Sequence, residues 1–389
     1  MKTVNLKVCT LALAAGMFFL ASCTDSDTTG NDGGDGNEVE NGATLKGTIT
    51  SDITLKAGNS YKLSGEYIVE SGATLNIQEG VTITAIGDDD IVDYILVKQG
   101  GKINAVGTAD KPIVMTSDLK EPGAWGGIHI CGKAQTNAGV GVSEIGDAKY
   151  GGNDDTDNSG TLKYLRVEYS GYAFNPEKEA NGITFYGVGS GTTVSHCEAY
   201  KGSDDGFEFF GGTVNISNMV VVSCSDDSYD WTEGWKGTGI NLVAYQEPQA
   251  TLGYDCDCLI EADNNENNFT STPIAHPILK NLILVGNGST ENKRGIRLRR
   301  GTQVSIDGAR VCGKGNAVTL ESEETENALL AGTSKLKNMT VDTPLKSEKG
   351  IYTNEAFEAA GNSIDSNLKY DSFAVIKAEC DWMAGNWVK

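Results

Sequence analysis

Two acidic segments in the middle of the chain bring together residues that could bind a metal ion or move a proton. Residues 203–209 read SDDGFEF, and residues 225–231 read SDDSYDW. The two segments match in residue type, position by position, at a spacing of 22 residues. A third acid, Glu261 in the segment LIEA, occupies the position equivalent to Glu208 and Asp230. Acids that recur at one position of a repeat gather in space if the repeat stacks.

The candidate metal site consists of carboxylates from these segments: Asp204, Asp205, Glu208, Asp226, Asp227, Asp230 and Glu261. Calcium takes about six to eight oxygen ligands, so a cluster of carboxylates and turn carbonyls suits Ca²⁺. A bound Ca²⁺ would also offset the repulsion between like charges on neighbouring strands. Two alternatives stay open. One carboxylate could keep a proton, as in hydrolases with paired acids, or the acids could be solvated, with Arg297 compensating Glu261.

The spacing of 22 residues also indicates the fold that would position these acids. Short apolar-polar-apolar strands can be aligned on both acidic segments and on further segments along the chain. A repeat of this length with two or three short strands is typical of one coil of a right-handed parallel β-helix. Stacked coils would hold equivalent residues about 4.8 Å apart. The middle residues of the aligned strands form one outward column: His129, Thr184, Glu208, Asp230, Glu261, Arg297 and Thr319.

The repeat pattern covers most of the chain and defines its domain organisation. We predict an all-β solenoid over residues 43–345, with polar loop insertions, the longest of them over residues 133–160. Residues 346–389 are less regular, and we expect an irregular cap over the open end of the solenoid. The best helix candidate in the cap is 354–361, and Trp382 and Trp387 are expected to pack it.

The first 42 residues have the features of an export signal followed by a tether. Two lysines precede the apolar run 8–20, which is too short to span a bilayer. The motif LASC at residues 20–23 resembles a bacterial lipobox, which implies a signal peptide over residues 1–22 and lipidation of Cys23. Residues 23–42 are acidic and polar, so we predict a flexible tether. Acids placed directly after the lipidated cysteine resemble the surface-export signal of Bacteroidetes lipoproteins.

The charge of the chain argues against one class of partner. The sequence has 31 Lys and Arg against 53 Asp and Glu, a net charge of −22, and loss of two lysines with the signal peptide gives 29 − 53 = −24. Nucleic acid is therefore not expected as a partner. Divalent cations and neutral or cationic ligands are favoured, whereas an anionic ligand would need a bridging cation or a local basic patch. The cysteines after Cys23 do not have the spacing of a disulfide framework or a zinc site.

Aromatic and acidic residues near the column suggest a carbohydrate-binding face. Proteins that bind sugars use aromatic rings for stacking and carboxylates or amides for the hydroxyl groups. The candidate ligand-binding residues are Trp235, Glu233 and Asp263. Strand alternation should point Tyr229 and Trp231 inward and leaves Trp235 free to face a ligand.

Three of these segments also carry a family resemblance. Residues 204–215 (DDGFEFFGGTVN), 226–235 (DDSYDWTEGW) and 260–265 (IEADNN) resemble a widespread family of bacterial surface lipoproteins with a pectin-lyase-like parallel β-helix. The resemblance covers most of residues 45–345 and implies the fold more strongly than the function, because one fold hosts many chemistries. Pectate lyases on this fold use calcium to neutralise a uronate and Arg or Lys as the base. A lyase activity would therefore make Arg297 and Arg299 the catalytic residues.

These features together predict a lipid-anchored protein on the surface of the outer membrane. We expect it to bind a polysaccharide or another extracellular ligand through a calcium-bearing acidic column, and to touch the membrane only through its lipid. An outer-membrane transporter is a further candidate partner. A calcium-dependent polysaccharide lyase is the alternative function, and a structural or adhesive surface protein is the third.

Overall fold

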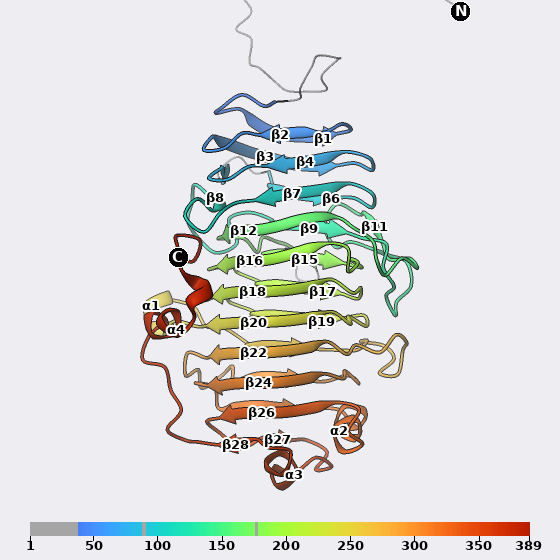
Figure 1. Cartoon of the computed structure of the whole chain (residues 1–389), viewed down its shortest axis with the longest axis vertical. Coiled ribbons are helices and arrows are strands. Elements are labelled where there is room, and N and C mark those ends of the chain that lie inside the picture. Colours follow the sequence, from blue (N-terminus) through green and yellow to red (C-terminus); the bar gives the residue numbers. More distant parts are fainter. Residues whose placement is uncertain (1–37, 88–90, 176–177) are drawn as a thin grey trace, which may run out of the picture.

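The computed structural model describes residues 38–87, 91–175 and 178–389. In these residues the backbone coils into a right-handed parallel β-helix, in which 24 strands form one continuous sheet around the core (Figure 1). The prediction of an all-β parallel β-helix is confirmed. The predicted signal peptide and Cys23 lie outside the described residues. No helix of the described ranges is long and apolar enough to cross a bilayer.

One side of the coil is a column of short strands, which we call the acidic column because it carries the acidic segments. Its strands pair in parallel from coil to coil. They are β6 (Tyr94–Val97), β9 (Ile128–Cys131), β15 (Ile183–Tyr186), β17 (Phe207–Phe210), β19 (Tyr229–Thr232), β21 (Ile260–Ala262), β23 (Arg294–Leu298), β25 (Asn316–Leu320) and β27 (Lys346–Ser347).

The other two sides of the coil start as separate strands and then merge. The first coils use β1 (Thr44–Ile49), β2 (Ile53–Leu55), β3 (Ser60–Val69), β4 (Thr74–Ile77), β5 (Thr82–Ala85), β7 (Lys102–Val106) and β8 (Ile113–Ser117). Strand β12 (Gly160–Glu168) pairs with β7 through its first half and with β8 through its second half. The later coils repeat this long strand as β16 (Thr193–Tyr200), β18 (Asn215–Val222), β20 (Thr238–Tyr245), β22 (Ile278–Val285), β24 (Ser305–Cys312) and β26 (Lys335–Val341), and β28 (Ser363–Ile364) follows.

Each long strand bends at one residue whose backbone is left-handed. The bend residues have φ between 52° and 83° and are Tyr164, His196, Asn218, Asn241, Asn281, Gly308 and Asn338. Asparagine tolerates this conformation better than most residues, which explains its recurrence here. The Nδ2 of Asn241 donates to Asn218 Oδ1 at 2.7 Å, and the Nδ2 of Asn281 donates to Asn241 Oδ1 at 3.2 Å. We call Asn218, Asn241 and Asn281 the asparagine ladder.

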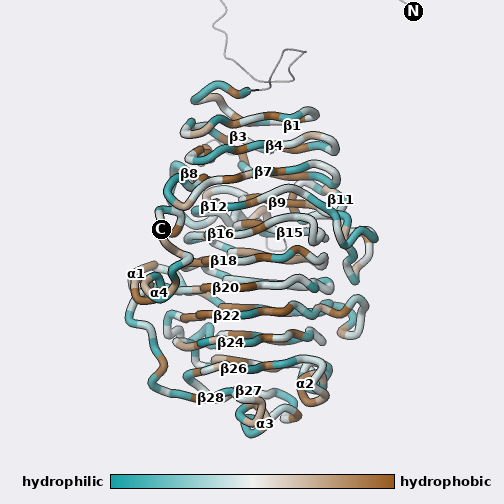
Figure 2. Tube along the Cα trace, viewed as in Figure 1, coloured by the Kyte–Doolittle hydropathy of each residue, from teal (hydrophilic) through white to brown (hydrophobic). Residues whose placement is uncertain are grey.

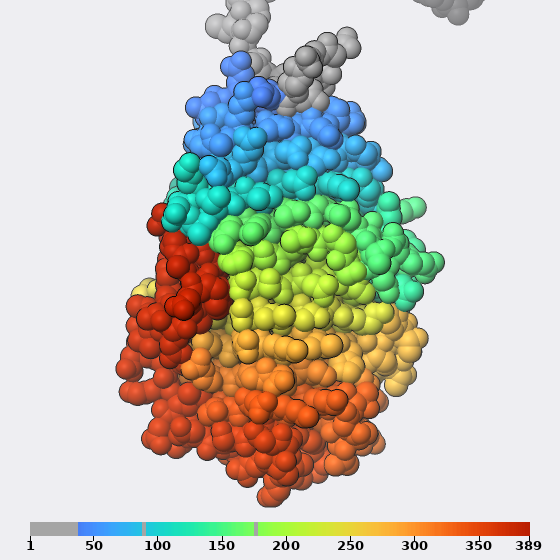
Figure 3. Space-filling view, viewed as in Figure 1, coloured from blue at the N-terminus to red at the C-terminus, as the bar shows by residue number. Residues whose placement is uncertain are grey.

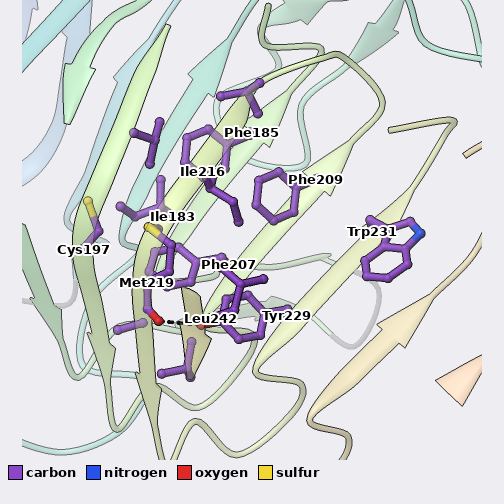
Figure 4. Close-up of a cluster of buried hydrophobic side chains, with 14 of the residues drawn as sticks. Ile183, Phe185, Cys197, Phe207, Phe209, Ile216, Met219, Tyr229, Trp231 and Leu242 are labelled. Carbon is purple, nitrogen blue, oxygen red and sulfur yellow. Dashed lines mark hydrogen bonds between the residues drawn. The ribbon is translucent and has the colours of Figure 1, made fainter. Parts of the chain in front are cut away.

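The interior of the solenoid is filled by the residues that flank each outward position. Phe207 and Phe209 lie on either side of Glu208 and are 0% and 1% exposed. Phe207 lies next to Tyr229 of the next coil (Figure 4), and the two rings stack with centroids 5.9 Å apart. Burial of such large side chains stabilises each coil only when its neighbour is in register. This packing fixes the direction in which the acids of the column point.

Two insertions project beside the acidic column. One contains the hairpin β10 (Gly141–Val142) and β11 (Lys149–Tyr150), and its loop is mostly hydrophilic (Figure 2). The other contains the hairpin β13 (Ala173–Asn175) and β14 (Lys178–Glu179). The short helices α1 (Gln249–Leu252) and α2 (Glu323–Leu330) lie between later strands. These insertions form walls beside the strands, and the periodicity of the strands alone does not predict them.

The C-terminal segment closes the end of the solenoid and then turns back along its side. Helix α3 (Asn354–Ala359) confirms the predicted helix, and its Phe357 is fully buried against the core. Helix α4 (Phe373–Glu379) and the short η1 (Asp381–Met383) then pack on outward residues of the long strands, where the last residues cover one flank (Figure 3). Trp382 and Trp387 belong to this flank. The prediction that they pack the end cap is therefore wrong.

The N-terminal boundary also differs from the prediction. Val39 N donates to Thr54 O at 3.3 Å, and Gly42 N donates to Ser60 O at 2.8 Å. The composition of residues 38–42, in which Val39 is the one apolar residue, predicts that they belong to the tether. Their backbone hydrogen bonds make them part of the first coil instead.

Candidate functional site

The predicted column of outward residues is present with the predicted register. Thr184 pairs with His129 on one side and with Glu208 on the other. The column then continues through pairs Glu208–Asp230, Asp230–Glu261, Glu261–Arg297 and Arg297–Thr319. Parallel strands lie about 4.8 Å apart, so each carboxylate has the next one as its neighbour.

The acids of the column line a cavity of about 370 Å³, which we call the acidic pocket. It is lined by Glu144, Glu179, Asn181, Asp204, Asp205, Glu208, Asp226, Asp227, Asp230, Asp257, Glu261 and Arg297. All seven predicted metal ligands are in this set. Glu144, Glu179 and Asp257 were missed, because they come from insertions whose path the repeat does not define. Among the described residues, the lining thus has ten carboxylates and one guanidinium.

The second aspartate of each acidic segment has a structural role as well. Asn181 Oδ1 accepts a hydrogen bond from Asp205 N at 3.1 Å, and Asp205 Oδ1 accepts one from Asp227 N at 2.9 Å. Asp227 Oδ1 accepts one from Cys258 N at 2.6 Å. Each side chain therefore ties its own turn to the turn of the next coil. This row orients Asp205 and Asp227 along the wall of the pocket.

Several groups of carboxylates in the pocket are close enough to share one ion. Ligand oxygens of Asp205, Glu208 and Asp230 lie within 4.8 Å of one another, and so do those of Asp227, Asp230 and Glu261. Asp230 belongs to both groups, and its Oδ1 is buried with no hydrogen-bond partner in the described residues. An unpaired buried carboxylate oxygen is costly, and a cation would satisfy it.

Burial and mutual repulsion make these acids hold protons more tightly than usual. Burial raises the pKa of Asp226 to about 6, and the charges of Asp257 and Glu261 contribute. Burial also raises the pKa of Glu144 to about 7. The pKa of Asp230 lies well above its usual range because of burial and the charge of Glu261. Neutralisation of the pocket near neutral pH thus requires either protons or a cation.

The arginine end of the column is already neutralised by ion pairs. Arg297 contacts Glu261 at 2.5 Å and holds Glu321 through two hydrogen bonds of 2.9 and 3.0 Å. Burial lowers the pKa of Arg297, but the hydrogen bonds to Glu321 and the charge of Glu261 outweigh burial and raise it. Arg299 is paired with Glu261 and with Asp263. A general base must give up its proton, and these pairs oppose that role for both arginines.

The three predicted ligand-binding residues do not form one site. Trp235 is 1% exposed, stacks on Phe209 with centroids 4.1 Å apart, and donates from Nε1 to Val214 O at 3.2 Å. The prediction that its ring faces a ligand is wrong. Glu233 accepts a hydrogen bond from Tyr150 at 3.0 Å, and Asp263 is paired with two arginines. Neither carboxylate lines the acidic pocket.

The coil geometry and the pocket together place the chain in the class of parallel β-helix proteins with a ligand-sized cavity over one sheet. A comparison with protein families identifies the group more closely. A family model described as a pectate-lyase-like beta helix domain matches residues 47–389, and the chain belongs to this family. No curated protein matches the chain. The family description fits glycan binding or polysaccharide cleavage in general terms.

Proposed function

We propose that this protein binds Ca²⁺ in the acidic pocket and uses the ion to hold an extracellular glycan. The observation that carries the proposal is the convergence of ten carboxylates on one cavity, where Asp230 Oδ1 has no partner. Calcium takes about six to eight oxygen ligands in flexible geometry, which a wall of carboxylates supplies. The bound ion would also accept a carboxylate of an acidic glycan that the charge of the protein otherwise repels.

Binding without cleavage is the form of this function that we favour. A lyase of the type suggested by the sequence needs a base beside the bound uronate. Arg297 and Arg299 are the nearest candidates, and each is engaged by two carboxylates. The long lateral face of a solenoid also suits an extended polymer.

We further propose that the β-helix is displayed on the outer surface of the outer membrane through lipidated Cys23. The lipobox-like motif and the acids behind it support this proposal. Mass spectrometry of the membrane-extracted protein should then find a lipid-modified cysteine at its N-terminus, and protease added to intact cells should remove the β-helix. A Cys23→Ala variant that stays membrane-bound and acylated would contradict the proposal.

The calcium site can be tested directly on the purified protein after chelation. Titration with Ca²⁺ should show saturable heat of binding, and an ion at 100 times its dissociation constant should add about 2.7 kcal/mol of stability. Asp230→Asn should weaken binding at least tenfold, because Asp230 belongs to two ligand groups. Asp110→Asn is the matched control, since Asp110 is exposed and lies outside the pocket. Absence of heat in the wild-type protein would overturn the proposal.

A further inference from the structure

A second groove lies on a different face of the solenoid, where the C-terminal segment crosses the long strands. Its volume is about 470 Å³, within the range of about 300–1,000 Å³ that small-molecule sites occupy. It is lined by Asn241, Val243, Asn281, Leu282, Ile283, Gly308, Ala309, Arg310, Asn338, Thr340, Cys380 and Trp382. We call it the ladder groove, because two members of the asparagine ladder line it. It shares no residue with the acidic pocket.

The lining of the ladder groove combines apolar surface with uncharged polar groups. Val243 and Ile283 are outward residues of adjacent long strands, and the indole of Trp382 is partly exposed. The carboxamides of Asn281 and Asn338 are exposed and can both donate and accept hydrogen bonds. The only charged side chain is Arg310, which Glu379 neutralises at 2.9 Å. A neutral ligand with hydroxyl groups and apolar faces matches this chemistry.

One missing side chain opens the groove. The asparagine ladder runs from Asn218 through Asn241 to Asn281, and the next bend residue is Gly308. A Cβ at Gly308 would meet only atoms of Asn281, the nearest being Oδ1 at 3.5 Å. The column of bend residues therefore has space for the Cβ of a side chain where the chain carries glycine. Asn338, one coil further, turns to Asp307 instead, to which its Nδ2 donates at 2.6 Å.

We propose that the ladder groove binds a neutral oligosaccharide, independently of calcium and of the acidic pocket. A sugar ring would pack on Trp382, whose flat apolar face suits the C–H face of a pyranose. The ring hydroxyl groups would bond to Asn281 and Asn338 on both sides of Gly308. The gap at Gly308 gives the ligand access to these two amides.

The test uses the purified protein and a panel of neutral hexasaccharides from glucans, mannans, galactans and xylans. Binding is followed by tryptophan fluorescence and by calorimetry, in buffer containing a chelator. Gly308→Asn should complete the ladder and fill the groove while keeping the fold, because asparagine occupies the equivalent left-handed bend on both neighbouring strands, with φ of 58° at Asn281 and 53° at Asn338. The matched control is Gly47→Asn, since Gly47 has φ of 75° in β1 and nothing within 4 Å of its Cβ position. Trp382→Ala removes the stacking surface.

The proposal expects at least one hexasaccharide to bind, with affinity lowered at least tenfold by Gly308→Asn and by Trp382→Ala. Gly47→Asn should bind as the wild-type protein does. Binding that persists in Gly308→Asn, or no binding of any hexasaccharide to the wild-type protein, overturns the proposal. Asp230→Asn separates the two sites, because it should impair calcium binding and leave the neutral hexasaccharide bound. A variant that loses calcium binding and still binds the hexasaccharide supports the proposal that the ladder groove acts independently of the acidic pocket.

Discussion

Replacement of Asp226 by asparagine tests whether the acidic pocket is under electrostatic strain without a cation. The pKa of Asp226 rises from 3.8 to about 6 on folding, chiefly through burial. The folded state therefore keeps a proton that the unfolded state releases between about pH 4 and pH 6. Stability falls as pH rises through that window, and the loss is complete above the folded pKa. Asp226→Asn has no such loss.

The size of the effect follows from the same pKa values. A change from 3.8 to about 6 corresponds to about 3 kcal/mol for a fully buried group. The side chain of Asp226 is partly exposed, and screening lowers the expected value to about 1–2 kcal/mol. The free energy of unfolding of Asp226→Asn minus that of the wild-type protein should grow by this amount from pH 4 to pH 7.

Urea denaturation in metal-free buffer at several pH values measures this difference. Histidines complicate a single protein's pH profile, because burial lowers the pKa of His129 to about 4 and makes stability rise between about pH 4 and 6.5. That contribution cancels between variant and wild type. Saturating Ca²⁺ should reverse the difference, since the ion stabilises the intact pocket. A difference between Asp226→Asn and the wild-type protein that stays flat with pH would refute the reasoning.

The remaining predictions concern the core, the ladder and the arginine end of the column. Phe209→Ala and Trp235→Ala should each lower the free energy of unfolding by about 3–5 kcal/mol in urea titrations, and a neutral result would contradict the core assignment of Trp235. Asn241→Ala loses two ladder hydrogen bonds at a left-handed bend and should cost roughly 2 kcal/mol; the exposed Asn367→Ala should cost almost nothing. Arg297→Ala should raise the calcium affinity severalfold in calorimetry, because Arg297 carries the one positive charge among the lining residues that the structure describes. A fall in affinity would show that Arg297 organises the site.

The sequence predicted the column because its spacing depends on the coil repeat alone. Glu208 and Asp230 lie 22 residues apart, and the structure pairs them directly. Glu144 and Glu179 could not be predicted, since they sit on insertions that are held against the column by contacts distant in sequence. The carboxylates on the strands and their turns were therefore predicted, and those on the insertions were not.

The error at Trp235 has a local cause. Alternation predicts the directions of Tyr229 and Trp231, but β19 ends at Thr232. The direction of Trp235 therefore depends on the turn that follows the strand. Glu233 and Gly234 both adopt left-handed backbone, with φ of 53° and 85°, and this turn returns Trp235 to the core. A Cβ at Gly234 would lie 2.2 Å from Pro273 O, so this position requires glycine. Gly234 indicates a turn in the sequence, but the geometry of that turn depends on the loop that carries Pro273.

The column also shows how this fold neutralises an acid with its own side chains. Glu261 has Arg297 directly beside it on the next strand, and Arg299 pairs with it as well. Asp230 and Glu208 occupy the equivalent positions one and two coils earlier, and no lysine or arginine in the described part of the chain forms an ion pair with either. A basic residue on a neighbouring coil would have neutralised them with the geometry already used at Glu261. Neutralisation of these two acids therefore requires bound protons or a cation from outside the chain, and the calcium titration distinguishes the two.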